Sequence, residues 1–231
     1  MPHKSLSAGP HRDAAEKRSL TEAPARLYIP AKYSVSTPQE GCDFRPVILE
    51  SDTGLRMARK REGLVILYTG NGKGKTTAAL GTLLRAWGRG MSVVMLSFIK
   101  AKTANFGEQR AARKLGIEML ALGQGFTWLS QDISVDQELA RKGWDLCKQK
   151  LASGDYDVVV LDEITHPINF GWLSLDDVMQ TIARRPKGTH VILTGRDAPS
   201  GLIAFADLVT EMREVKHPFQ RGIKAQPGID F

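Results

Sequence analysis

A glycine-rich segment between residues 69 and 77 has residue types and a spacing that suit phosphate binding. It reads Thr-Gly-Asn-Gly-Lys-Gly-Lys-Thr-Thr, with an apolar run before it and an Ala- and Leu-rich run after it. Glycines let consecutive backbone N–H groups turn toward phosphate oxygens, and a helix that follows adds the positive end of its dipole. The sequence therefore predicts ATP or phosphate contacts from Gly70, Asn71, Gly72, Lys73, Gly74, Lys75, Thr76 and Thr77.

Two side chains of this phosphate loop have distinct chemistry. Lys75 supplies a mobile positive charge, and the Thr76 hydroxyl is a suitable oxygen ligand for Mg²⁺. Loops of this pattern have a glycine where this chain has Thr69, and we expect the glycines at 70, 72 and 74 to compensate. A tight turn with a helix cap is the alternative interpretation, but it leaves Lys73 and Lys75 without a role.

An acidic pair follows a strongly β-branched run. Asp162 and Glu163 come directly after residues 158–161. A carboxylate at the end of a buried parallel strand lies at the sheet edge that also carries the phosphate loop. The pattern predicts that Asp162 or Glu163 holds Mg²⁺, directly or through water, together with Thr76. The alternative is that the pair caps the next turn or binds a surface base. His166 has no His or Cys near it in the sequence, so we interpret it as a polar loop residue.

Two other segments are expected at the same edge. Phe126 and Trp128 stand in a loop with two glycines, where aromatic side chains suit the face of a large flat ligand. A hydrophobic plug under the loop is the alternative. Arg196 ends a strand and is either a phosphate contact or an ordinary loop arginine. These features leave the reaction open, because kinases, ATP-driven motors and nucleotidyl transferases share the phosphate loop and the acidic pair.

Strand-like and helix-like segments alternate from residue 63 onward. Strands are expected at 64–69, 92–98, 117–122, 157–161, 190–194 and 208–215, and helices at 76–88, 107–115, 135–151 and 173–184, the last opened by Ser174. In the third helix the apolar residues at 135, 139, 146, 147 and 151 are expected to form the buried stripe. This alternation predicts an α/β fold with a mostly parallel β-sheet and helices on both faces. The phosphate loop makes it a P-loop NTPase fold.

The first 62 residues differ from the rest in composition. They hold six of the eleven prolines and show no sustained apolar period, so we expect an N-terminal arm at 1–62, irregular or partly ordered, and a domain at 63–231. The net charge of +7 is spread over both parts, with 11 basic and 8 acidic residues in the arm and 21 and 17 in the domain. Charge distributed in this way does not favour a nucleic-acid partner.

The chain also lacks the sequence signals of membrane and secreted proteins. No apolar run approaches the roughly 18 residues needed to span a bilayer, and the N-terminus has no apolar core of a secretory signal. Two cysteines cannot form a disulfide framework or a zinc site by themselves. We therefore expect a cytoplasmic protein without a membrane partner.

Taken together, several separate segments resemble the corrinoid adenosyltransferases of the CobA/CobO/BtuR type. The resemblance covers about residues 63–231 and rests on residues 69–79, 97–100, 125–128, 160–163 and 194–196 and on the tail at 215–219 and 222–231. It implies a RecA-like sheet. The arm does not match, since members of the family have a shorter basic helical start.

The resemblance implies a reaction in which Co(I) of a corrinoid attacks the 5′-carbon of ATP and inorganic triphosphate leaves. Lys75 would then stabilise the leaving group together with Mg²⁺, and Arg196 would belong to the ATP site. Phe126 and Trp128 match the aromatic residues at the corrinoid face, which exclude the lower axial ligand of cobalt in that family. The resemblance further implies a homodimer and a reduced flavoprotein as electron donor. It does not favour cobyrinic acid a,c-diamide, cobinamide or cobalamin as the principal corrinoid.

Two other functions compete with this interpretation. A RecA-like ATPase that depends on nucleic acid would release orthophosphate when nucleic acid is added, and its binding would depend steeply on salt. A corrinoid carrier that uses ATP as a ligand switch would bind both molecules without forming a cobalt–carbon bond.

Overall fold

The computed structural model describes residues 62–101, 106–123 and 133–230. The expected N-terminal arm, Phe126 and Trp128 lie outside these residues. The described strands form one six-stranded sheet in the order β3-β2-β4-β5-β1-β6, and every neighbouring pair is parallel. The strands are β1 (Val65–Thr69), β2 (Val93–Ala101), β3 (Glu118–Gly123), β4 (Val158–Asp162), β5 (His190–Thr194) and β6 (Leu208–Glu211). The predicted parallel sheet is confirmed.

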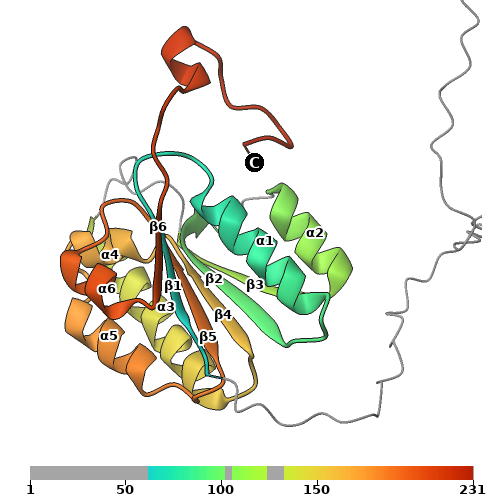
Figure 1. Cartoon of the computed structure of the whole chain (residues 1–231). Coiled ribbons are helices and arrows are strands. Elements are labelled where there is room, and N and C mark those ends of the chain that lie inside the picture. The colour runs from blue at the N-terminus through green and yellow to red at the C-terminus, as the bar shows by residue number, and fades with distance from the viewer. Residues whose placement is uncertain (1–61, 102–105, 124–132, 231) are drawn as a thin grey trace, which may run out of the picture. The chain divides into compact units, whose positions relative to one another are not determined.

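Helices cover both faces of the sheet (Figure 1). One face carries α1 and α2, and the other carries α3, α5 and α6. The helices are α1 (Lys75–Trp87), α2 (Gly107–Leu115), α3 (Ile133–Ser153), α4 (Thr165–Asn169), α5 (Leu175–Ala183) and α6 (Ser200–Phe205), and a 3₁₀ turn spans Pro218–Arg221. Ser174 caps α5 as predicted, since its side chain accepts a hydrogen bond from the Asp177 N–H. The predicted α/β fold with two covered faces is therefore confirmed.

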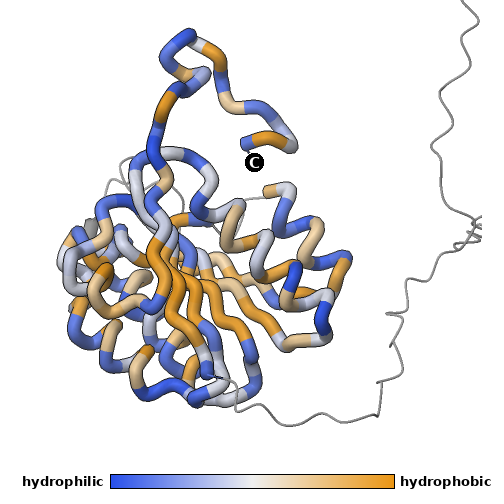
Figure 2. Tube along the Cα trace, in the orientation of Figure 1, coloured by the Kyte–Doolittle hydropathy of each residue, from blue (hydrophilic) through white to orange (hydrophobic). Residues whose placement is uncertain are grey.

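Alternation along each strand divides the apolar side chains between two cores. In β4, Val158 and Val160 pack with residues of α1 and α2, whereas Val159 and Leu161 pack with residues of α3 and α5. All five residues of β4 are buried because neighbouring strands and helices surround it. Figure 2 shows that the most apolar stretches of the described residues lie in the strands. The end of β4 that carries Asp162 is thus held in place by packing on both faces of the sheet.

The buried stripe of α3 differs from the prediction. Val135 is 39% exposed, whereas Asp136 is buried. The buried side chains follow a spacing of three and four residues, which keeps them on one face of a helix. They are Asp136, Ala140, Trp144, Cys147 and Leu151.

The last strand and two short helices also differ from expectation. β6 ends at Glu211 rather than at residue 215, because its partner β1 ends at Thr69 and offers no further backbone groups for pairing. The helices α4 and α6 were not predicted, since five and six residues are too few to show a helical period. His166 therefore lies in α4 and not in a loop. Among the described residues no helix is both long enough and apolar enough to cross a membrane.

Candidate functional site

The carboxyl ends of three adjacent strands bring the predicted motifs together. Thr69, Asp162 and Thr194 are the last residues of β1, β4 and β5, which are neighbours in the sheet. The phosphate loop leaves β1 at this edge and enters α1, so Thr76 reaches β4. The Thr76 Oγ1 donates a hydrogen bond to Asp162 Oδ1 at 2.8 Å. The expectation that the loop and the acidic pair lie side by side is thus met in the geometry.

The phosphate loop wraps around the ammonium group of Lys75. Gly70 and Gly74 have φ angles of +93° and +110°, which a residue with a Cβ rarely adopts. Lys75 is only 5% exposed, and its Nζ donates to the carbonyl oxygens of Gly70 and Gly72, each at 2.8 Å. Burial lowers the pKa of Lys75, although the nearby Glu163 carboxylate opposes this effect. The buried ammonium lies at the start of α1, whose N-cap Gly74 has no side chain to block an anion.

Thr69 has a structural role at the position where such loops have a glycine. Its side chain is buried, and its Oγ1 accepts a hydrogen bond from the Ala198 N–H at 3.2 Å. Its carbonyl oxygen accepts from the Met212 N–H at 2.8 Å. Thr69 therefore ties the loop both to the segment after β5 and to the chain that leaves β6.

Asp162 is a fully buried carboxylate held by hydroxyl groups. Its Oδ1 accepts from Thr76 Oγ1 and Thr194 Oγ1, each at 2.8 Å, and its Oδ2 accepts from Ser97 Oγ at 3.1 Å. Burial raises the pKa of Asp162, and the Lys100 ammonium, 3.7 Å from Oδ2, opposes this. Since hydroxyl donors occupy both oxygens, this carboxylate is suited to orienting Thr76.

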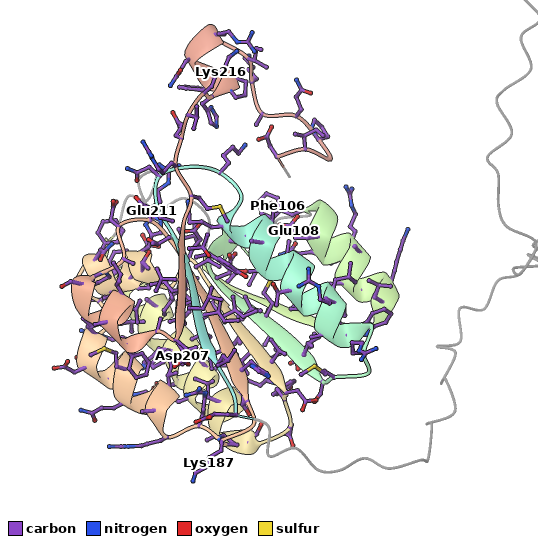
Figure 3. All side chains as sticks on the ribbon, viewed as in Figure 1. Phe106, Glu108, Lys187, Asp207, Glu211 and Lys216 are labelled. Atoms are coloured by element: carbon purple, nitrogen blue, oxygen red, sulfur yellow. The ribbon has the colours of Figure 1, made fainter. Side chains whose placement is uncertain are left out.

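Lys100 links the acidic site to the start of α2. Its Nζ lies 2.5 Å from Glu108 Oε1 and 5.4 Å from the centre of the Phe106 ring. Glu108 and Phe106 lie together at the beginning of α2, on the same side of the molecule as the carboxyl edge (Figure 3). Neither Lys100 nor Ser97 was predicted as a site residue, although both belong to a segment, Ser97–Lys100, that resembles the adenosyltransferases.

Glu163 is a second carboxylate at this edge, and its hydrogen bonding differs from that of Asp162. Its φ is +59°, in the left-handed region, and its N–H donates to Thr194 Oγ1 at 2.8 Å. Its Oε2 is buried and makes no aligned hydrogen bond with the described part of the chain, although His166 Nε2 lies 3.2 Å away. Burial acts to raise the pKa of Glu163, but the contact with His166 and the positive charges of Lys75 and Arg196 together hold it below the ordinary value. An ionised oxygen without a full set of donors is suited to binding a cation.

Arg196 lies at the same edge in a turn of fixed geometry. Gly195 has a φ of +148°, and a Cβ there would collide with the side chain of Thr165. The Thr165 Oγ1 donates to the Arg196 carbonyl oxygen at 2.7 Å. The Arg196 side chain is exposed, and its positive charge helps to lower the pKa of both Lys75 and Glu163. Arg196 is therefore within electrostatic reach of the loop and of the acidic pair.

The remaining predicted loop residues face outward. Asn71 and Thr77 are exposed, and half of the Lys73 side chain is exposed. Lys73 forms an ion pair with Asp230, near the end of the chain. No local pattern could predict this pair, since the two residues are 157 positions apart in the sequence.

The donor set fits Mg²⁺ better than a metal held by protein ligands alone. No group of three or more His, Cys, Asp or Glu side chains that could hold a metal occurs within the described parts of the chain. Mg²⁺ in nucleotide sites usually takes one or two carboxylates and completes its shell with substrate phosphates and water. The Thr76 hydroxyl and the unsatisfied Glu163 Oε2 provide such a set.

A narrow cavity lies beside the acidic site. Its volume is about 20 Å³, enough for one water molecule. The Asp136 Oδ2 is buried and has no hydrogen-bond partner among the residues that the structure describes, so a water in this cavity would satisfy it. The cavity is lined mainly by Phe98, Leu122, Asp136, His166, Pro167 and Trp172.

The match to a family and the sequence relatives point to the same family. Residues 61–231 match the family described as ATP:corrinoid adenosyltransferase BtuR/CobO/CobP. The corrinoid adenosyltransferase of Escherichia coli strain K12 is 41% identical over 180 residues, which cover 78% of this chain and 91% of the relative. That of Pseudomonas aeruginosa is 43% identical over 182 residues, covering 78% and 89%. Among solved structures, the flagellar accessory protein FlaH of Methanocaldococcus jannaschii aligns with a TM-score of 0.48 and 14% identity, over 65% of this chain and 71% of that one.

The hydroxyl network around Asp162 predicts a stability effect. Thr194→Val keeps the side-chain shape but removes a donor to Asp162 and the acceptor of the Glu163 N–H. We expect the free energy of unfolding to fall by about 1–3 kcal/mol, because buried polar groups lose their partners. Urea denaturation measures the change.

Thr210→Val is the matched control, since Thr210 is exposed on β6. We expect that change to stay within about 0.5 kcal/mol. Equal losses in the two variants would show that the hydroxyl network does not stabilise the site.

Proposed function

The chain belongs to the ATP:corrinoid adenosyltransferase family BtuR/CobO/CobP, and from this premise we propose how its residues act. The protein is a transferase whose substrates are ATP and a corrinoid. We propose that ATP binds at the carboxyl edge, with its triphosphate on the phosphate loop. The observation that best supports this is the Thr76–Asp162 hydrogen bond, which joins the loop to the acidic pair next to the buried Lys75 ammonium.

In the proposed reaction, Co(I) of the corrinoid donates an electron pair to the 5′-carbon of the ATP ribose. A cobalt–carbon bond forms, the bond between this carbon and the 5′-oxygen breaks, and its electron pair leaves with the triphosphate. No proton is transferred in this step, so the protein needs no general base. Its task is to orient the two substrates and to stabilise the charge that develops on the leaving group.

Lys75 and the loop backbone stabilise the leaving triphosphate in this proposal. The Lys75 Nζ donates to two loop carbonyl oxygens, and turning toward a phosphate exchanges these for charge-assisted hydrogen bonds. Gly70, Gly72 and Gly74 let the backbone approach the phosphates, and the start of α1 adds its dipole. Asn71, Lys73, Thr77 and Arg196 are exposed around this site, where they can contact the nucleotide.

Thr76 and Glu163 are the proposed Mg²⁺ ligands. When bound, Mg²⁺ neutralises charge on the triphosphate. The Glu163 Oε2 is buried without an aligned donor, whereas hydroxyl groups already occupy both oxygens of Asp162. We therefore assign direct binding to Glu163 and assign Asp162 to orienting Thr76 or to binding through water.

Phe126 and Trp128 are the proposed corrinoid-face residues, although they lie outside the described residues. They follow β3, which ends at Gly123 on the carboxyl edge of the sheet. Aromatic side chains below the corrin ring would exclude a lower axial ligand and water from cobalt. Without a donor below the ring, the orbital that must accept an electron is lower in energy, so Co(II) is more easily reduced to Co(I).

We propose that the protein works in the cytoplasm as a homodimer and receives electrons from a reduced flavoprotein. The family match begins at residue 61, which supports a domain at 63–231 and a separate arm at 1–62. Light scattering on the purified chain tests the dimer, and a monomer at working concentration would contradict it. Turnover from Co(II) with a reduced flavoprotein tests the electron donor.

One assay tests the proposed reaction against its alternatives. ATP, Mg²⁺ and chemically reduced corrinoid are mixed with the protein, the corrinoid spectrum is followed, and the phosphate products are identified. Adenosyl transfer yields an adenosylcorrinoid and triphosphate in equal amounts. Orthophosphate without an adenosylcorrinoid would indicate an ATPase, and binding without either product would indicate a carrier.

Lys75→Ala is expected to lower the rate of adenosylcorrinoid formation in this assay about 100- to 1000-fold. Loss of one group that stabilises developing charge typically has an effect of this size. Lys114→Ala is the control, because Lys114 is exposed near the end of α2. A Lys75→Ala protein with full activity would exclude the proposed leaving-group role.

Phe126→Ala or Trp128→Ala is expected to slow turnover from Co(II) more than turnover from supplied Co(I). We expect the two starting states to differ by about tenfold or more, which corresponds to about 1.4 kcal/mol. The rates are measured with one reductant at a fixed potential and then with prereduced corrinoid. Equal losses from both states would contradict the exclusion of an axial ligand.

A further inference from the structure

The last described segment of the chain is attached to the phosphate loop at both of its ends. We call residues 212–230 the C-terminal strap. At its beginning, the Gly72 N–H donates to the Met212 carbonyl oxygen at 2.7 Å. At its end, Asp230 forms an ion pair with Lys73. Two neighbouring loop residues therefore hold a segment whose ends are 18 positions apart.

The first attachment follows from the sheet. β6 runs parallel to β1 with Glu211 paired to Thr69, so the chain leaves β6 where the phosphate loop leaves β1. The contact is between backbones: a Cβ on Gly72 would lie 2.7 Å from the carbonyl carbon of Arg213. The beginning of the strap is thus held firmly against the phosphate loop.

The second attachment is electrostatic and close to solvent. The Asp230 side chain is 15% exposed and the Lys73 side chain 51% exposed. The other carboxylate oxygen of Asp230 accepts from the Gln226 N–H at 2.8 Å, so a short turn presents the carboxylate to the loop. Ion pairs near solvent are weak, which makes this attachment reversible.

Between its ends the strap does not pack on the domain. Val215, Phe219 and Ile229 are 93%, 75% and 82% exposed. Figure 1 shows the strap rising from β6 and turning back, and Lys216 in Figure 3 lies on the part away from the sheet. Few contacts would have to break for the end of the strap to move.

We propose that ATP displaces the end of the C-terminal strap from the phosphate loop, because its triphosphate and the Asp230 carboxylate compete for Lys73. The inference rests on the proposed ATP site. A triphosphate carries several negative charges and attracts Lys73 more strongly than one carboxylate does, and Asp230 next to it would be repelled. In some of the molecules Asp230 occupies Lys73, and only the remaining fraction is ready to bind ATP. The apparent affinity for ATP is therefore lowered in proportion to the occupied fraction.

Asp230→Asn removes the competing charge and should tighten ATP binding about two- to sixfold, the range expected for an ion pair of this kind. Isothermal titration calorimetry on the full chain measures the dissociation constant. Glu214→Gln is the control, because Glu214 is an exposed acidic residue of the strap whose side chain accepts a hydrogen bond from Gln220, also in the strap, at 3.1 Å. In a Lys73→Ala background, Asp230→Asn should leave the dissociation constant for ATP unchanged, because the ammonium group for which ATP and Asp230 compete is absent.

Limited proteolysis gives a second readout that does not depend on catalysis. The strap carries four trypsin sites, at Arg213, Lys216, Arg221 and Lys224. ATP should accelerate cleavage at Arg221 and Lys224, because the end of the strap is released. Protection by ATP would overturn the inference, since it would show the strap closing on the nucleotide.

The outcomes separate this inference from the proposed function. If the unmodified protein does not bind ATP, the proposed site fails and the inference fails with it. If it binds ATP and Asp230→Asn weakens binding or leaves it unchanged, only the inference is overturned. An equal effect of Glu214→Gln would also overturn it, because net charge alone would then explain the change.

Discussion

The rest of the site depends on the buried carboxylate of Asp162 and the hydroxyl groups that satisfy it. Removing a carboxylate from water is costly unless hydrogen bonds replace the lost hydration. Asp162 obtains its donors from α1, β2 and β5 through Thr76, Ser97 and Thr194. Each donor lies in a different element, so satisfying this one group fixes the start of α1, the middle of β2 and the ends of β4 and β5 relative to one another.

The same network separates the tasks of two adjacent acidic residues. Asp162 is the last residue of β4, where hydroxyl groups occupy both of its oxygens. Glu163 follows in a left-handed conformation, which turns the chain out of the strand, and its N–H donates to Thr194. Its Oε2 is left without an aligned donor next to the buried Lys75 ammonium. Neighbours in sequence thereby become one structural carboxylate and one that is available to a cation.

Much of the architecture could be predicted from patterns within short segments. The β-branched run before Asp162, the apolar run before the phosphate loop and the Ser174 cap each depend on neighbouring residues, and the structure has the corresponding strands and cap. The prediction for α3 was wrong at Val135, because hydrophobicity alone does not show which face of a helix meets the sheet. The short helices α4 and α6 were missed because tertiary contacts stabilise them and no periodic pattern marks them.

The sequence by itself determined the local chemistry: a phosphate loop between a strand and a helix, an acidic pair at the end of a buried strand, and segments whose order resembles one enzyme family. These features are readable because glycine conformation, helix dipoles and strand burial act over a few residues. Only the tertiary structure decided which carboxylate is satisfied by hydroxyl groups and which is left available to a cation, where Thr69 binds, and that residues 212–230 return to the loop. Those contacts join residues up to about 160 positions apart, and their partners are set by the order of strands in the sheet, which no local pattern encodes.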